Sequence, residues 1–170
     1  SVFVRHWDRW EDGRRSHVFV LPISGGPAVD LMAGLDADSP SVPFGGASDF
    51  AFTPDSESVV LSSKVVRGDK KEPWSTNYDL WLAPADGSAP PRNLTDANDA
   101  RDTGPVFSPD GGTLAYRAME RPGFESERYR IMLRGWPEGE PRKLAPDWDR
   151  SPGTLLWSAD GSTLFATAAN

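Results

Sequence analysis

Hydrophobic residues in this chain fall in short runs in which apolar and polar positions alternate, and no stretch shows convincing helical spacing. A two-residue period is typical of a β-strand with one buried face. It occurs at Val59 and Leu61, at Leu114 and Tyr116, and at Leu164 and Ala166. Further strands are predicted by apolar runs at residues 18–21, 80–82 and 131–133. The pattern therefore predicts an all-β chain built from short strands.

A five-residue unit lies between predicted strands and recurs every 50 to 55 residues, at residues 52–56, 107–111 and 157–161. Its order is an aromatic residue, Ser or Thr, Pro or Ala, Asp, and then Gly or Ser. Proline presets φ at the first turn position, aspartate bonds its own backbone, and glycine accepts a positive φ. We therefore expect a hairpin turn at each unit, with the aromatic residue ending a strand and facing the core.

Four short strands in each repeat are typical of β-propeller blades, which stack because one sheet cannot bury both of its faces alone. We predict a β-propeller fragment of about three four-stranded blades, taken from a larger propeller of about seven blades. The expected parts are a half blade at residues 1–31, blades at about 48–96 and 104–145, and a half blade at 152–167. An insertion within residues 32–48 is expected to form a loop. A β-sandwich of similar hairpins is the alternative.

Charge and composition narrow the function classes. Among 170 residues, 25 acidic and 18 basic side chains give a net charge of −7. This balance argues against a general nucleic-acid binder and against a basic membrane-surface protein, because both need a cationic face. No apolar run approaches the length of a membrane helix, and the absence of cysteine excludes disulfides and thiolate sites. We expect no nucleic-acid or membrane partner, and we predict no cofactor.

Two longer stretches carry a family resemblance. Residues 5–20 read RHWDRWEDGRRSHVFV, and residues 116–128 read YRAMERPGFESER. Together with the repeated turn units, they resemble the N-terminal propeller of the prolyl oligopeptidase family of serine peptidases, in its dipeptidyl aminopeptidase/acylaminoacyl peptidase branch. The resemblance covers essentially the whole chain.

The resemblance implies a propeller that sits over a C-terminal α/β-hydrolase domain and admits only short peptides. In that family the hydrolase domain carries a Ser-Asp-His triad with the serine in a G-x-S-x-G elbow. This chain contains no such motif, and its closest approach, Gly45-Gly46-Ala47-Ser48, lacks the closing glycine. We therefore expect no catalytic residue in this chain and no hydrolysis by it alone. The hydrolase domain, absent from this chain, and short peptides are its expected partners.

The first group of candidate site residues lies near the N-terminus: Arg5, His6, Trp7, Asp8 and Trp10. One reading places them at the end of a strand, where they make local polar contacts. In the other reading they face the central tunnel or the hydrolase domain, since exposed aromatics beside charges suit an interface. A catalytic histidine would need an activated serine and an orienting acid beside it, which the sequence does not arrange for His6 or His17.

The second group lies in a charged stretch where Glu120, Glu125 and Glu127 alternate with arginines. Its plain interpretation is a solvated hairpin tip with mixed charges. By the resemblance, a carboxylate here would hold the N-terminal ammonium of a peptide, and an arginine would hold a carbonyl or carboxylate. The candidate tunnel or interface residues are Glu120, Arg121, Phe124 and Glu125.

An acidic loop with Asp96, Asn98, Asp99 and Asp102 suggests calcium, but the EF-hand register puts Arg101 where glycine belongs. We therefore predict turn formation and no metal site. We expect Trp74, Trp81, Trp136, Trp148 and Trp157 to pack between blades.

Two wider alternatives stay open. A TolB-like propeller serving as a protein-interaction module fits the repeats equally well. Blades with open edges also invite self-association. The start at Ser1, without a signal peptide, suggests a piece of a longer protein, for which a periplasmic or secreted location is compatible with the branch.

Overall fold

A computed structural model describes residues 13–42, 44–65 and 75–169. Within these ranges the chain forms strands joined by turns, with a single 3₁₀ turn, η1 (Ala47–Asp49), as its one helical element. The strands are β1 (Phe19–Val20), β2 (Val29–Asp30), β3 (Phe50–Phe52), β4 (Ser58–Ser63), β5 (Asp79–Pro84), β6 (Arg92–Asn93), β7 (Asp102–Phe107), β8 (Thr113–Ala118), β9 (Arg130–Gly135), β10 (Pro141–Leu144), β11 (Pro152–Trp157) and β12 (Leu164–Ala168).

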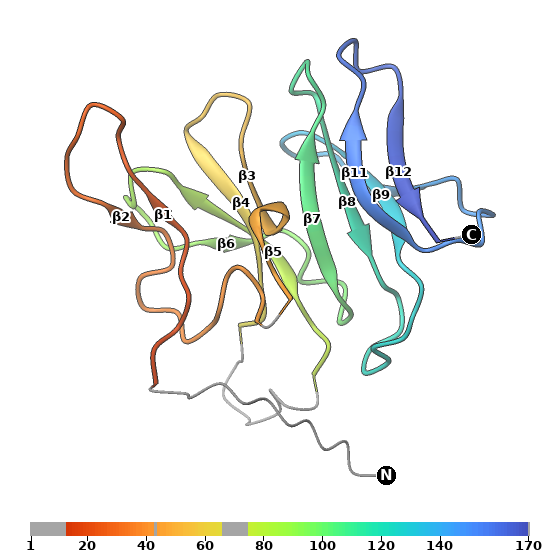
Figure 1. Ribbon diagram of the computed structural model, residues 1–170, viewed down its shortest axis with the longest axis horizontal. Helices are drawn as coiled ribbons and strands as arrows, with labels where there is room; N and C mark the ends of the chain where they lie inside the picture. The colour runs from red at the N-terminus through yellow and green to blue at the C-terminus, as the bar shows by residue number, and fades with distance from the viewer. Residues whose placement is uncertain (1–12, 43, 66–74, 170) are drawn as a thin grey trace.

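The strands form antiparallel sheets that follow one another along the chain (Figure 1). Two sheets have four strands each, in the orders β3-β4-β5-β6 and β7-β8-β9-β10, and β1-β2 and β11-β12 form strand pairs on either side. Each sheet thus takes its strands in chain order, as a propeller blade does. The all-β fold predicted from the sequence is confirmed, and the described sheets do not close into a ring.

Three apolar clusters lie at the seams between neighbouring sheets. The first joins β1 and β2 to one face of the β3–β6 sheet through residues such as Val18 and Leu61. The second joins the opposite face to the next sheet through Val60, Leu80 and Tyr116. The third continues onto the β11-β12 pair. Four tryptophans pack into these clusters as predicted, namely Trp81, Trp136, Trp148 and Trp157, while Trp74 lies outside the described residues.

The repeated turn unit has the chemistry expected of it. The Ser108 hydroxyl donates to Asp110 and accepts a hydrogen bond from the backbone N–H of Thr113 at 2.9 Å. The Asp110 carboxylate accepts the N–H of Gly112 at 3.0 Å, and Gly111 adopts a φ of +73°. Equivalent contacts are made in the other units by Thr53, Asp55 and Ser58, and by Ser158, Asp160 and Thr163.

One expectation about the unit is wrong. Phe107 packs edge-to-face on Trp136 with ring centroids 4.9 Å apart, and Trp157 packs against the third cluster, but Phe52 is 51% exposed. Trp136 follows the third strand of its sheet, and the equivalent position in the preceding sheet is Ala85. The smaller side chain leaves the Phe52 ring without the cover that Phe107 receives.

We predict that Leu80→Ala lowers the free energy of unfolding by about 2 to 5 kcal/mol, because Leu80 is fully buried between two sheets and its loss leaves a cavity. Denaturant unfolding of the full-length protein measures the change. Leu21→Ala, at a position 64% exposed, is the matched control and should change the unfolding free energy little. Equal losses in the two variants would contradict burial at the seam.

Candidate functional site

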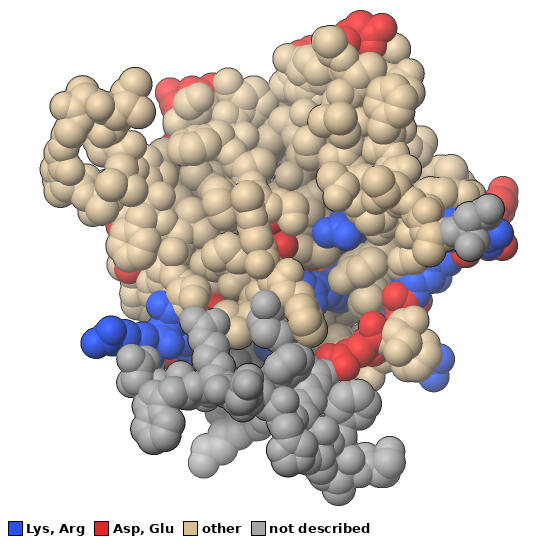
Figure 2. Space-filling view, in the orientation of Figure 1, with Lys and Arg blue, Asp and Glu red and all other residues tan. Residues whose placement is uncertain are grey.

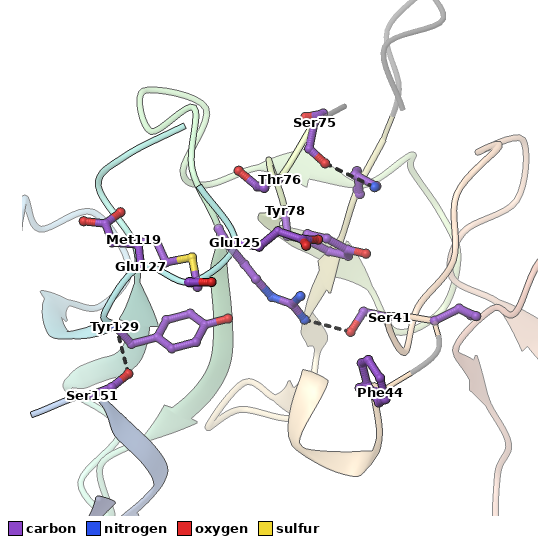
Figure 3. Close-up of a pocket in the computed structure, with 14 residues that line it drawn as sticks. Ser41, Phe44, Ser75, Thr76, Tyr78, Met119, Glu125, Glu127, Tyr129 and Ser151 are labelled. Carbon is purple, nitrogen blue, oxygen red and sulfur yellow. Dashed lines mark hydrogen bonds between the residues drawn. The ribbon is translucent and has the colours of Figure 1, made fainter. Parts of the chain in front are cut away.

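A cavity of about 590 Å³ opens at one end of the strands, where β4 leads to β5 and β8 leads to β9 (Figure 3). We refer to it as the end cavity. Loop residues before η1 and the residues that precede β7 and β11 complete its wall. Its lining includes Ser41, Phe44, Lys64, Tyr78, Arg101, Met119, Glu125, Glu127 and Tyr129. Figure 2 shows basic and acidic side chains lying close together near the β8–β9 hairpin.

Two tyrosines at equivalent positions of the repeat line the end cavity. Tyr78 immediately precedes β5, and Tyr129 immediately precedes β9. The Arg101 guanidinium lies 4.2 Å from the Tyr78 ring centroid, and the Arg117 guanidinium lies 5.2 Å from that of Tyr129. The Lys64 ammonium also lies over Tyr78, at 5.3 Å. Such cation–π contacts stabilise by about 0.5 to 2 kcal/mol each, so they give the wall a fixed aromatic and cationic surface.

A buried carboxylate fixes the loop on the other side. Asp49 is 4% exposed and accepts hydrogen bonds from the Ser41 backbone N–H and hydroxyl, both at 2.9 Å, and from the Thr103 hydroxyl at 3.2 Å. The Arg101 guanidinium donates to the same Ser41 hydroxyl at 3.0 Å. Any side chain at Gly45 would collide with the Ser41 backbone. The loop is thereby tied to β7, and Asp49 positions Arg101 through Ser41.

Arg117 lies behind this wall and is largely buried. Burial lowers the pKa of its guanidinium, while the neighbouring Tyr129 and Asp49 oppose the shift. Burial likewise raises the pKa of the Tyr129 phenol. Both groups therefore keep their usual charge states at neutral pH, since a guanidinium and a phenol titrate far above it.

Glu127 has a structural role in the β8–β9 hairpin. Its carboxylate accepts the backbone N–H groups of Glu120 and Arg121 and an Arg130 side-chain N–H at 3.0 Å. Burial opposes ionisation of Glu127, but these donors outweigh burial and hold its pKa below the ordinary value. The charged side chains of Glu127 and Arg130 are therefore committed to shaping the hairpin.

The four candidate residues of the β8–β9 hairpin, Glu120, Arg121, Phe124 and Glu125, lie in different surroundings in the structure. Glu125 lines the end cavity. Glu120 instead forms ion pairs with Arg130 at 2.8 Å and with Lys143, away from that cavity. Arg121 and Phe124 stack on one another in the exposed tip, with the guanidinium 4.6 Å from the ring centroid. The N-terminal candidates Arg5, His6, Trp7, Asp8 and Trp10 lie outside the described residues.

Several cavity residues were not identified from the sequence, among them Ser41, Lys64, Tyr78 and Arg101. The repeat itself held a signal for some of them. The residue after the second strand and the residue before the third strand recur in both sheets, as Lys64 and Met119 and as Tyr78 and Tyr129. Ser41 and Phe44 come from the insertion loop, which has no counterpart in the other repeats and gave no such signal.

The acidic stretch that leads into β7 contains one buried member. Asp102 is 1% exposed, whereas Asp96 and Asp99 are exposed. Burial raises the pKa of Asp102 to about 7, although side-chain hydrogen bonds from Asn98 and Thr95 favour its ionised form. Across residues 13–42, 44–65 and 75–169 there is no group of three or more His, Asp or Glu side chains suited to a metal ion. No helix in these ranges is long and apolar enough to span a membrane.

No family model matches the chain. Curated relatives do match, and they carry the name dipeptidyl-peptidase 5. The chain is 34% identical to the proteins of that name from Arthroderma otae and Trichophyton equinum and 33% identical to the one from Trichophyton schoenleinii. Each alignment covers 99% of this chain and 25% of the relative. The chain is thus similar to peptidases, as its motifs suggested, and it spans about a quarter of their length.

We predict that stability falls as pH rises from about 4 to 7, because folded Asp102 keeps its proton up to about pH 7, whereas the unfolded chain loses it near 3.8. In this window the folded state binds the extra proton, so the unfolding free energy decreases by up to about 4 kcal/mol. Asp102→Asn should flatten this part of the profile, measured by denaturant unfolding across pH. The exposed Asp99→Asn control should keep the wild-type slope. An unchanged slope in Asp102→Asn would refute the raised pKa.

Proposed function

We propose that the chain is the non-catalytic propeller segment of a prolyl oligopeptidase-family serine peptidase that releases dipeptides from short peptides. In this proposal the end cavity receives the amino-terminal end of the substrate. The observation that carries the proposal is a preformed cavity lined by two carboxylates, two cations and aromatic rings, in a chain similar to dipeptidyl-peptidases.

A peptidase that removes two residues must recognise a free amino terminus, which is a cation followed by peptide carbonyl groups. A carboxylate accepts charge-assisted hydrogen bonds from such an ammonium, and an arginine donates to a carbonyl. Glu125 and Arg101 supply these two groups at the end cavity. Phe44, Met119 and Tyr129 supply apolar surface for the first side chains of the substrate.

The chemical step belongs to a hydrolase domain outside this chain, where an activated serine attacks the peptide carbonyl and an oxyanion hole stabilises the resulting charge. The contribution of the propeller is positioning. When the propeller holds one end of the substrate, the scissile peptide bond is already oriented toward the catalytic serine. The reaction between two molecules then proceeds nearly as an intramolecular step. The rigid wall built by Asp49, Ser41 and Arg101 suits that role.

The cavity chemistry favours dipeptidyl-peptidase activity over acylaminoacyl-peptidase activity within the branch. An acylated amino terminus carries no positive charge, so it would make no charge-assisted hydrogen bond with Glu125, whereas a free amino terminus would. The peptidase names of the relatives also favour this proposal over a TolB-like interaction module.

We predict that Glu125→Gln in the full-length enzyme lowers kcat/KM for dipeptidyl substrates with a free amino terminus by about tenfold or more, mainly through KM, since one charge-assisted contact is lost. The measurement is steady-state hydrolysis of a chromogenic dipeptide amide. Glu57→Gln, an exposed acid in the β3–β4 turn, is the matched control and should retain wild-type kinetics. Equal kinetics in wild type and Glu125→Gln would remove Glu125 from the substrate site.

A gate should also discriminate by size. We predict that the full-length enzyme cleaves a short peptide efficiently but leaves the same amino-terminal sequence intact when it directly precedes a folded domain, because the propeller restricts entry. Mass spectrometry of both products tests this. As a control, unfolding the attached domain should restore cleavage. Equal cleavage of the two substrates would argue against a gate and leave the role of Glu125 to be judged separately.

A further inference from the structure

A second cavity, of about 350 Å³, lies on the face of the β7–β10 sheet that is turned toward the β3–β6 sheet. We refer to it as the inter-sheet cavity. Cross-strand register places Asp102 opposite Ala118, Tyr116 opposite Met132, and Leu114 opposite Arg134. Because paired residues share a face of a sheet, these side chains project toward the same seam. The β6–β7 connection, with Leu94 and Asn98, covers one side of the cavity.

Two buried polar atoms among the residues that line this cavity have no hydrogen-bond partner within the described structure. One is Oδ2 of Asp102, which has no donor within hydrogen-bond distance, although the nearby Thr95 hydroxyl favours the ionised form. The other oxygen of Asp102 accepts the Asn98 amide N–H at 3.0 Å. The second is Nε of Arg134, whose Nη1 donates to the Leu94 carbonyl at 2.8 Å. An unmade hydrogen bond at a buried polar group costs about 1 to 3 kcal/mol, and more at a charged group. Nearly all buried polar groups in native proteins have a hydrogen-bond partner. We therefore expect a bound molecule in this cavity to supply one.

The rest of the lining indicates the chemistry of that partner. Tyr116, Ala118, Met119 and Met132 present apolar surface, and methionine side chains adapt to irregular ligands. Glu120 and Glu140 join Asp102 and Arg134 in the lining. Glu120 is already paired with Arg130 and Lys143, which leaves Asp102 and Glu140 as the acids of the lining without an ion pair in the part of the chain that the structure describes. A small cation with an apolar body matches both features, since its charge would compensate a buried carboxylate that would otherwise be destabilising.

We propose that the inter-sheet cavity binds a small organic ammonium ion, whose N–H donates to Oδ2 of Asp102 while its apolar group lies against Tyr116, Met119 and Met132. This site is separate from the proposed peptide site, because the two cavities share Met119 alone among their lining residues. Its test uses binding and no catalytic readout, so failure of one proposal leaves the other standing.

The ionisation of Asp102 makes this binding dependent on pH. The groups that act on it are Asp79 from β5, Tyr116 from β8, and Arg134 from β9 beside that tyrosine, with Tyr129 further off. Burial raises the pKa of Asp102 to about 7. The carboxylate form is therefore a minor species at pH 6 and dominant at pH 8, so ammonium binding should strengthen about tenfold over this range.

The experiment is isothermal titration calorimetry of the full-length protein with 2-phenylethylammonium chloride, and 2-phenylethanol serves as the neutral probe of the same shape. We expect saturable binding of the ammonium ion, at least about tenfold tighter than binding of the alcohol. Asp102→Asn should weaken ammonium binding about tenfold and abolish its pH dependence. The exposed Asp99→Asn variant, from the same loop, is the matched control and should bind like wild type.

A second variant guards against a folding defect in Asp102→Asn. Ala97 is an exposed residue of the cavity lining, so Ala97→Phe should obstruct the opening without altering the sheets, and it should abolish binding. Equal affinity for the alcohol and the ammonium ion would overturn the proposal in favour of a purely apolar cavity. Absence of binding by either probe would overturn it in favour of a hydrated cavity, in which water satisfies Asp102 and Arg134.

Discussion

The whole structure depends on sheets that must be buried on both faces. Val60 and Leu61 are adjacent in β4, so they point to opposite faces, and both are fully buried. One packs in the first seam and the other in the second. No four-stranded sheet of this kind is stable in isolation, because one face would expose its apolar side chains to water. Each sheet therefore depends on stacking for its stability, and the end cavity and the inter-sheet cavity result from the way in which successive sheets meet.

Stacking brings polar groups of different sheets into contact, and these contacts set the relative position of the sheets. The Ser62 hydroxyl donates to the Asp102 carbonyl at 2.8 Å, and the Asp102 N–H donates to the Tyr78 carbonyl at 2.7 Å. Thr103 reaches back to Asp49. Apolar packing alone tolerates sliding, whereas buried hydrogen bonds have strict geometry. The end cavity lies beside this network, which therefore holds the cavity wall in a fixed position.

Most of the fold could be predicted from the sequence, because its determinants are local. The repeated turn unit, the two-residue alternation and the seam tryptophans each depend on a few neighbouring residues. The site was harder to predict from the sequence. Glu125 was identified within the charged hairpin, but Arg101, Lys64 and Ser41 reach the same cavity from segments far apart in the chain. The wrong expectation for Phe52 has the same origin, since its exposure is decided by Ala85, across the sheet.

Asp102 shows most clearly what sequence reasoning misses. Within its acidic loop it was indistinguishable from Asp96 and Asp99, which are exposed and suit a turn. Only the stacking of two sheets places its carboxyl between them, where burial shifts its pKa and leaves one oxygen without a partner. The other side chains of this seam are mainly apolar, so the buried carboxyl group of Asp102, together with Arg134, sets the polarity of the inter-sheet cavity.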